Sequence, residues 1–195
     1  MAEKWKLQCA HVKTNLEPYS RALTEMECFT LFEALELIDF YLERSLAGSC
    51  KLGGTLATYG WSGSVKLGKL EKLIKEAIGI ESDQFLIART GSFPKTLNRF
   101  GFEKNKPICV DCPRVAITIE FEVIEGVLKP KKGKTRVGCF LRHIRNAIAH
   151  GNTFEFPNGN ILFIDYSRTN ATSGFILLPA TALIEIMQLI VAGPS

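Results

Sequence analysis

Apolar side chains recur three and four positions apart in four stretches of the chain, which is the spacing that gives a helix one apolar face. The stretches cover residues 24–46, 64–80, the segment that ends near 150, and 179–191. Glycines at 48, 79 and 151 follow the first three and are good helix terminators. The last stretch is apolar nearly all round, so we expect a buried helix that fills either the chain's own core or a subunit interface.

Strands are predicted where apolar and polar residues alternate, because successive side chains of a strand point to opposite faces. Residues 114–123 alternate in this way, which predicts a half-buried strand. Residues 153–156 and 161–166 flank an Asn-Gly turn and predict a hairpin, and a third strand is expected at 174–178. We expect a short helix around 82–88 and irregular structure from 89 to 112, which contains several Gly and Pro residues. The expected fold class is α+β, predominantly α.

The helix that ends near residue 150 is the best candidate for chemistry. Residues spaced four apart share a helix face, so Arg142, Asn146 and His150 should line up opposite the apolar arc. Arg145 lies on the flank of that face and His143 nearby. Arginine and histidine are also ordinary choices for the last turn of a helix. The spacing alone therefore leaves a purely structural role open.

The run from Arg145 through Asn146 to His150 resembles the signature of the HEPN superfamily, an Arg, a polar residue, three further residues and a His. This superfamily includes prokaryotic toxins and eukaryotic RNA-cleaving domains. The hairpin after His150 and the final apolar helix resemble a subgroup typified by a plasmid-encoded HEPN protein. The resemblance implies one HEPN-like domain over residues 1–195. It would have a helical core, a HEPN-like bundle, at 24–80 and 135–192, and an irregular or β-rich insert at 89–134.

The resemblance also implies an activity, which is metal-independent endonucleolytic cleavage of single-stranded RNA. Two copies of the motif helix would meet across a twofold axis in a homodimer and form one cleft. Arg145, Asn146 and His150 would be catalytic, with no metal ion and no cofactor, whereas Arg142 and His143 would contact the substrate. Whether His150 acts as acid or base stays open. A toxin or phage-defence role would add an antitoxin or other regulatory protein as a partner.

Two alternatives stand beside this hypothesis. A non-catalytic HEPN protein that binds RNA or regulates another protein would carry the same motif. An unrelated structural or protein-binding domain would use Arg145 and His150 only to finish a helix.

Basic residues point to RNA only weakly, because the formal net charge is +4 and the sequence pI is about 8.7. Lys131, Lys132 and Lys134 form a basic loop directly before the motif helix, so we expect them near the mouth of the cleft as substrate contacts, or else simply in solvent. Lysines at 66, 69, 72 and 75 repeat every three residues. That stripe is typical of a solvated helix face and would also suit an RNA backbone.

The remaining motifs do not indicate other chemistry. Cys109 and Cys112 have metal-ligand spacing, but no second pair completes a zinc site, which favours a loop or turn. The Gly-rich segment 50–63 matches neither a phosphate loop nor a nucleophile elbow. In it, Tyr59 and Trp61 are either buried loop anchors or base-stacking residues. Without a signal sequence or a membrane-length apolar run, we expect a cytoplasmic protein with no membrane partner.

Overall fold

The computed structural model describes residues 5, 56–104, 106–108, 111–119, 121–124, 127–130, 135–167 and 169–195, and the predicted helix at 24–46 lies outside these ranges. Side chains are described throughout this set except at residue 90 and in 121–130. The helices are α4 (Ser64–Ile78), the short 3₁₀ helix η1 (Thr90–Ser92), α5 (Phe93–Arg99), α6 (Arg136–Ala149) and α7 (Ala180–Ala192). The strands are β1 (Phe85–Ile87), β2 (Val115–Thr118), β3 (Phe121–Ile124), β4 (Val127–Pro130), β5 (Thr153–Glu155), β6 (Asn160–Tyr166) and β7 (Thr172–Pro179).

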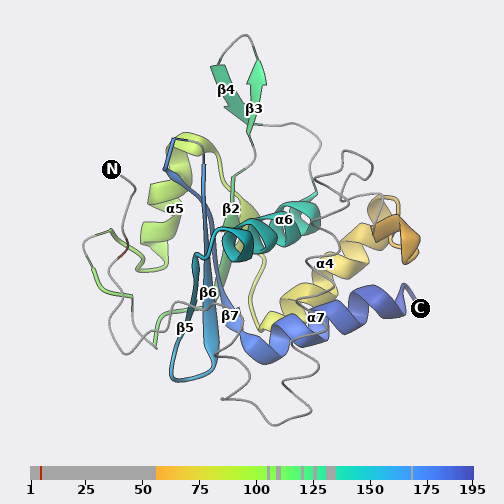
Figure 1. Ribbon diagram of the computed structural model, residues 1–195. Coiled ribbons are helices and arrows are strands. Elements are labelled where there is room, and N and C mark those ends of the chain that lie inside the picture. The colour runs from red at the N-terminus through yellow and green to blue at the C-terminus, as the bar shows by residue number, and fades with distance from the viewer. Residues whose placement is uncertain are drawn as a thin grey trace.

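A five-stranded sheet occupies the centre of the described structure, with the strand order β1-β2-β7-β6-β5 (Figure 1). β1 runs parallel to β2, and the other neighbours are antiparallel. Within the described residues, strands β3 and β4 pair only with each other, and they form a hairpin that projects away from this sheet (Figure 1). The chain therefore brings segments from both sides of the motif helix α6 into one sheet.

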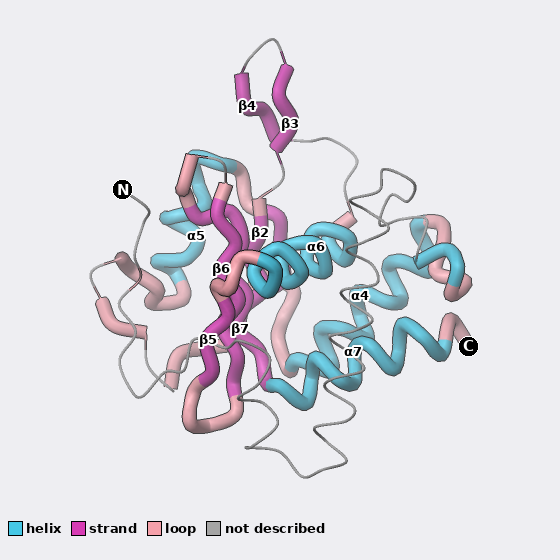
Figure 2. Tube along the Cα trace, in the orientation of Figure 1, coloured by secondary structure: helices cyan, strands magenta, loops and turns pink. Residues whose placement is uncertain are grey.

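Helices cover both faces of the sheet, with α4, α6 and α7 on one side and α5 on the other (Figure 2). Strand β7 shows why, because its alternate residues enter different cores. Ile176 and Leu178 belong to the cluster under the three helices, whereas Phe175 and Leu177 belong to the cluster under α5. Because the strand is apolar on both faces, the sheet is stable only as a middle layer.

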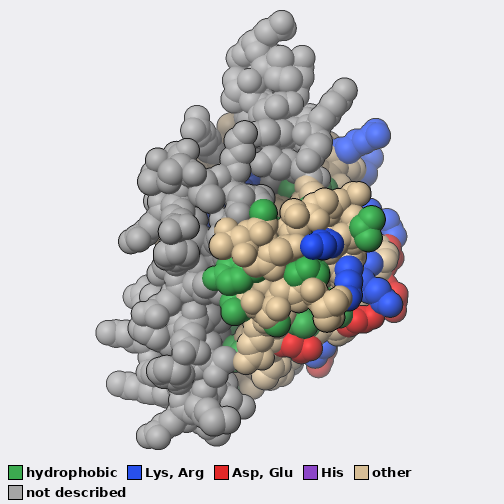
Figure 3. Space-filling view, turned by 90° about the vertical axis from the view of Figure 1, so that its right-hand side faces the viewer, with side chains coloured by type: hydrophobic (Ala, Val, Ile, Leu, Met, Phe, Trp, Pro, Cys, Tyr) green, Lys and Arg blue, Asp and Glu red, His purple; other side chains and the backbone are tan. Residues whose placement is uncertain are grey.

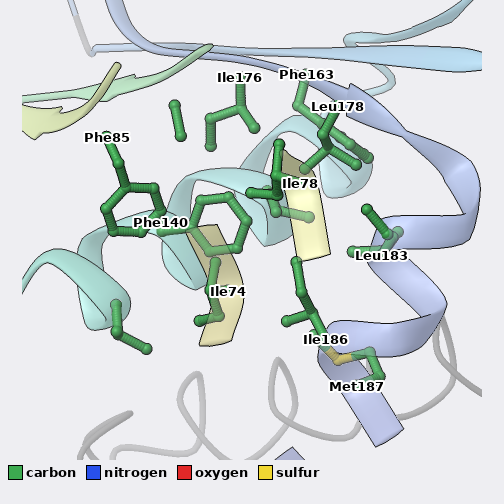
Figure 4. Close-up of a cluster of buried hydrophobic side chains, with 14 of the residues drawn as sticks. Ile74, Ile78, Phe85, Phe140, Phe163, Ile176, Leu178, Leu183, Ile186 and Met187 are labelled. Carbon is green, nitrogen blue, oxygen red and sulfur yellow. The ribbon is translucent and has the colours of Figure 1, made fainter. Parts of the chain in front are cut away.

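The larger core lies between the sheet and the three helices (Figure 4). Phe140 of α6 contacts Phe85 of β1, with ring centroids 5.3 Å apart. Ile186 of α7 and Ile74 of α4 are fully buried in the same cluster. Burying each such side chain contributes about 1.5–3 kcal/mol relative to leaving it in water. The apolar face of α7 is thus buried in the chain's own core. Of the two alternatives for this helix, the core and a subunit interface, the structure supports the core.

Much of the expected secondary structure is confirmed. The structure contains the predicted helices at 64–80 and 179–191, the hairpin β5–β6 and the third strand β7. The prediction of a short helix around 82–88 is wrong, because this segment contains the strand β1. Phe85 pairs with Ala116 and packs on Phe140, and this tertiary packing overrides local propensity.

The segment before the motif helix also differs from expectation. The single half-buried strand predicted at 114–123 is two strands, of which β2 is buried on both faces and β3 belongs to the projecting hairpin. The segment expected to be irregular contains α5, whose Phe93 and Leu97 are buried four residues apart. The described residues therefore form an α+β fold built on a sheet, and they do not confirm the expected helical bundle. None of the helices in these ranges is both long and apolar enough to cross a membrane.

Candidate functional site

The candidate site lies on α6, whose two ends are defined by ordinary capping chemistry. Thr135 is the N-cap, and its hydroxyl oxygen accepts a hydrogen bond from the backbone N–H of Gly138 at 3.1 Å. At the other end Gly151 has a φ of +63° and Asn152 donates its backbone N–H to the carbonyl of Ala147 at 2.8 Å. Glycine adopts this left-handed conformation without strain. The last helical residue is Ala149, His150 is the C-cap, and the chain turns away at Gly151. The expected end of the motif helix is confirmed.

The three residues of the motif are all at the surface end of this helix. Arg145 and Asn146 are half-buried, and His150 is exposed. The guanidinium of Arg145 donates from Nη1 to Oδ1 of Asn146 at 3.0 Å. The amide of Asn146 in turn donates from Nδ2 to Oδ2 of Asp165, also at 3.0 Å. The Arg and Asn side chains are thus joined to each other and to strand β6.

His143 does not lie with them on the free face, because only 2% of its surface is exposed. Its Nδ1 is 2.7 Å from Oδ2 of Asp165, and its Nε2 is 2.9 Å from the carbonyl oxygen of Ile119. The sequence placed His143 near the open face as a substrate contact, whereas its ring is packed between α6 and the sheet. Arg142 is half-buried, with Nη2 3.2 Å from the same Nε2.

The neighbours of His143 define the role of its Nδ1. Nε2 donates to the carbonyl oxygen of Ile119 only when it carries a proton, because a carbonyl oxygen can only accept. The same nitrogen accepts from Nη2 of Arg142, 3.2 Å away, only when it carries none, so these two contacts favour different protonation of Nε2. Asp165 Oδ2 receives both Nδ1 of His143 and Nδ2 of Asn146, an arrangement that suits a carboxylate. In either case Nδ1 carries a proton and donates it to the buried Asp165 carboxylate, the proton being assigned from the hydrogen-bond partners.

Sequence reasoning missed Asp165, although the chain carried a signal. It is the one charged residue in the stretch 160–166, which otherwise reads as a buried apolar strand, and buried charges need partners. The burial of His143 had a signal too. At about 100° per residue it lies about 40° from Ala147, at the edge of the apolar arc, and about 60° from Asn146. Both signals follow from one rule, which is that a polar residue beside an apolar stripe needs a hydrogen-bond partner in the core.

The predicted basic contacts are placed only in part. Lys131, Lys132 and Lys134 lie outside the described residues. The lysines of α4 lie on a face where basic and acidic side chains mix (Figure 3). Lys72 is 3.7 Å from Glu76, and Lys75 is 3.8 Å from Glu71. Glu71 also accepts a hydrogen bond from Arg136 at 2.9 Å. These carboxylates offset the positive charge of the stripe.

Two other sequence motifs have simple structural outcomes. Trp61 is 1% exposed and donates from its indole N–H to the carbonyl of Ile190 at 3.0 Å, which confirms the buried-anchor alternative for this residue. Tyr59 is half-buried beside the same core. Cys109 lies outside the described residues, so the geometry of its pair with Cys112 is not described.

The fold and the motif together define an α+β domain with an Arg-Asn pair and a His at the end of a buried helix. A protein-family model described as HEPN pEK499 p136 matches residues 61–192, which is well over half of the chain. The chain therefore belongs to this HEPN family. The matched range runs from Trp61 through α7, so it includes the sheet as well as the helices. Comparison with curated proteins and with solved structures found no match.

Proposed function

We propose that the protein is a metal-independent endoribonuclease that cleaves single-stranded RNA in a cleft formed by two copies of the chain. Membership of a HEPN family suggests an RNase or an RNA-binding function. The observation that carries the finer proposal is the surface end of α6. There Arg145 is hydrogen-bonded to Asn146, Asn146 is held by Asp165, and His150 is exposed beside them.

The residue types suit cleavage by the neighbouring ribose hydroxyl. That reaction needs a group that takes or gives a proton and a cation that stabilises the additional negative charge on phosphorus. An imidazole such as that of His150 exchanges protons near neutral pH. The planar guanidinium of Arg145 pairs with two phosphate oxygens at once, which a lysine does not do equivalently. Asn146 orients the guanidinium, and the products carry a 2′,3′-cyclic phosphate and a 5′-hydroxyl.

A dimer completes the site. The motif of one copy supplies a single arginine and a single histidine, which is few groups for a reaction that needs an acid, a base and charge stabilisation. An isologous contact through the ends of two α6 helices would bring two of each around one phosphate. We place Arg142, Lys131, Lys132 and Lys134 along the RNA backbone on either side of the cleaved bond.

The decisive experiment incubates the purified protein with mixed cellular RNA in the presence of a chelator. We expect the wild-type protein to cut RNA, and His150→Ala and Arg145→Ala to lose cleavage while they stay folded. Arg145→Lys should recover little activity, because it keeps the charge without the planar fork. Lys106→Ala removes an exposed cation beside Glu103 and serves as the control for lost positive charge.

Three outcomes would contradict the proposal. Cleavage that needs added metal would refute the chemistry even if RNA is cut. A wild-type protein that binds RNA but leaves it intact would support the non-catalytic HEPN alternative. A protein that stays monomeric in ultracentrifugation at micromolar concentration would rule out the composite site.

We further propose a cytoplasmic role as a toxin or phage-defence component that an antitoxin or other regulatory protein restrains. Expression of the wild type alone should then arrest growth, and expression of His150→Ala should not. Unchanged growth under induction of an active nuclease would count against a toxin role while leaving the enzymatic proposal intact.

A further inference from the structure

A continuous chain of hydrogen bonds runs from the motif into the interior of the protein. Arg145 donates to Asn146, and Asn146 donates to Asp165, at 3.0 Å in each case. Asp165 pairs with His143 at 2.7 Å, and His143 bonds to the carbonyl of Ile119 at 2.9 Å. The half-buried Arg145 side chain is thereby linked to strand β6 and to Ile119, the residue that follows β2.

Asp165 is the centre of this chain and is almost inaccessible to solvent. Its side chain is 5% exposed and that of His143 is 2% exposed. A carboxylate removed from water must be given donors by the protein. Both of its donors come from α6, where residues 143 and 146 are one turn apart and share a helix face. The carboxylate therefore fixes the rotation of this part of α6 against the sheet.

The same carboxylate fixes which way the amide of Asn146 points. Its Nδ2 faces the Asp165 oxygen and its Oδ1 faces Nη1 of Arg145. A rotated amide would place its oxygen against the carboxylate and its N–H groups against the guanidinium N–H groups, which loses both hydrogen bonds. Only one orientation satisfies both neighbours, and in that orientation the amide oxygen receives the guanidinium.

The ring of His143 packs closely against Gly174 of β7. A Cβ on Gly174 of β7 would stand 2.7 Å from Nδ1 of the ring and 2.8 Å from its Cγ. The ring therefore occupies the space that a side chain at 174 would need. The hydrogen bond of 2.7 Å keeps Nδ1 directed at Asp165.

We propose that Asp165 is a positioning residue of the nuclease site, which orients Asn146 and through it the guanidinium of Arg145, with His143 as its buried hydrogen-bond partner. This inference rests on the proposed function for its effect on cleavage. Its geometric part, the fixed amide of Asn146, stands on the hydrogen bonds alone. Asp165 does not touch RNA; it acts only through Asn146.

The first test uses the wild-type protein and needs no variant to fold. In ¹⁵N-asparagine-labelled protein, the side-chain amide of Asn146, assigned by its loss in Asn146→Ala, should exchange with water more slowly than that of the exposed Asn170. Its two protons should also give widely separated resonances, because one of them is donated to a carboxylate. An Asn146 amide that exchanges as fast as that of Asn170 would overturn the proposal.

The second test is a double-mutant cycle on single-turnover RNA cleavage. Asp165→Asn should lower the cleavage rate about 10- to 100-fold, by analogy with residues that hydrogen-bond to metal ligands and orient them. In an Asn146→Ala background the same change should have less than about a twofold effect, since the groups act as one unit. An equal loss in both backgrounds would show that Asp165 acts by another route.

A neighbouring substitution separates positioning from general loss of stability. Ser173→Ala removes a buried hydroxyl that donates to the backbone carbonyl of Asp165 at 3.2 Å, and it leaves the carboxylate and its two donors in place. It should leave the Asn146 resonances and the cleavage rate near wild type. A loss of activity equal to that of Asp165→Asn would assign the residue a purely structural role. If the wild type cuts no RNA, the nuclease proposal fails, and the exchange measurement still judges whether Asp165 holds Asn146.

Discussion

Gly174 of β7 lies directly against the ring of His143, so that a Cβ added to the glycine would stand 2.7 Å from Nδ1 and 2.8 Å from the histidine Cβ. Cβ atoms do not approach other side chains this closely. The contact also involves no flexible end that swings away, because the ring is held by Asp165 on one side and Ile119 on the other. The absence of a side chain at residue 174 is thus what allows a histidine to sit between α6 and the sheet.

Gly174→Ala should therefore destabilise the protein by about 1–3 kcal/mol, the usual cost of overpacking a filled core. Chemical denaturation monitored by circular dichroism measures the change in the free energy of unfolding. The same substitution at Gly68, in the exposed interior of α4, meets no atom within 4 Å and is the matched control. Gly68→Ala should stabilise by about 0.5–1 kcal/mol, since alanine favours the helix. Equal effects at the two positions would show that His143 packs less closely against Gly174 than the structure indicates.

The pair formed by His143 and Asp165 should show the asymmetry of a buried carboxylate and its hydrogen-bond donor. His143→Leu leaves the carboxylate buried with only the Asn146 amide as donor, and we expect it to lower the free energy of unfolding by about 3–5 kcal/mol. Combining it with Asp165→Leu should cost less than the sum of the two single changes, because the second change removes the unpaired charge. Denaturant titration of the three variants measures the coupling. Additive losses would mean that the two side chains do not interact.

Trp61 should prove important for stability and unimportant for RNA. Its indole is buried and donates to the carbonyl of Ile190 in the last turn of α7. Trp61→Phe removes this donor, and we expect a loss of about 1–3 kcal/mol in the free energy of unfolding. Affinity for single-stranded RNA, measured by fluorescence anisotropy with the folded variant, should stay unchanged. A variant with normal stability and weakened RNA binding would restore the base-stacking interpretation.

Periodicity predicted those elements that present one apolar face to the core. The helices α4, α6 and α7 have this character. The strands β6 and β7 are buried on both faces, and the hairpin β5–β6 was expected from its Asn-Gly turn instead. Periodicity did not predict short elements whose conformation depends on pairing with a distant segment. Strand β1 spans three residues, and it is a strand because Phe85 to Ile87 pair with β2, whose residues are about thirty positions away. No local signal in the segment specifies such a partner.

The site could be predicted only along one helix. The spacing of Arg145, Asn146 and His150 within a single helix is visible in the sequence, because a helix relates residues by a fixed rotation. The partner of Asn146 comes from β6, and the relation between a helix and a strand depends on the packing of the whole core. His143 shows the same limit. His143 is buried because Asp165 of β6 supplies a hydrogen-bond partner for its ring. The two residues are far apart in the sequence, so the helical spacing of α6 does not predict this contact.

Partial burial raises the pKa of the Glu155 carboxyl, on the edge strand β5, above its ordinary range. A raised pKa means that the folded protein binds this proton more tightly than the unfolded chain does. The associated stability is fully present below the ordinary Glu value of about 4.3 and is lost as the pH rises through the raised value. At neutral pH the folded state thus carries an ionised carboxylate at a site that disfavours it.

Glu155→Gln should accordingly stabilise the protein at pH 7, and the gain should shrink toward zero as the pH falls to about 4, where the wild-type carboxyl becomes protonated in both states. Thermal denaturation of both proteins across this pH range gives the difference in melting temperature. Glu185→Gln on the exposed side of α7 removes the same unit of charge outside a buried setting and controls for the change in net charge. A gain that is constant with pH, or that the Glu185 variant reproduces, would show that burial of the Glu155 carboxyl is not its cause.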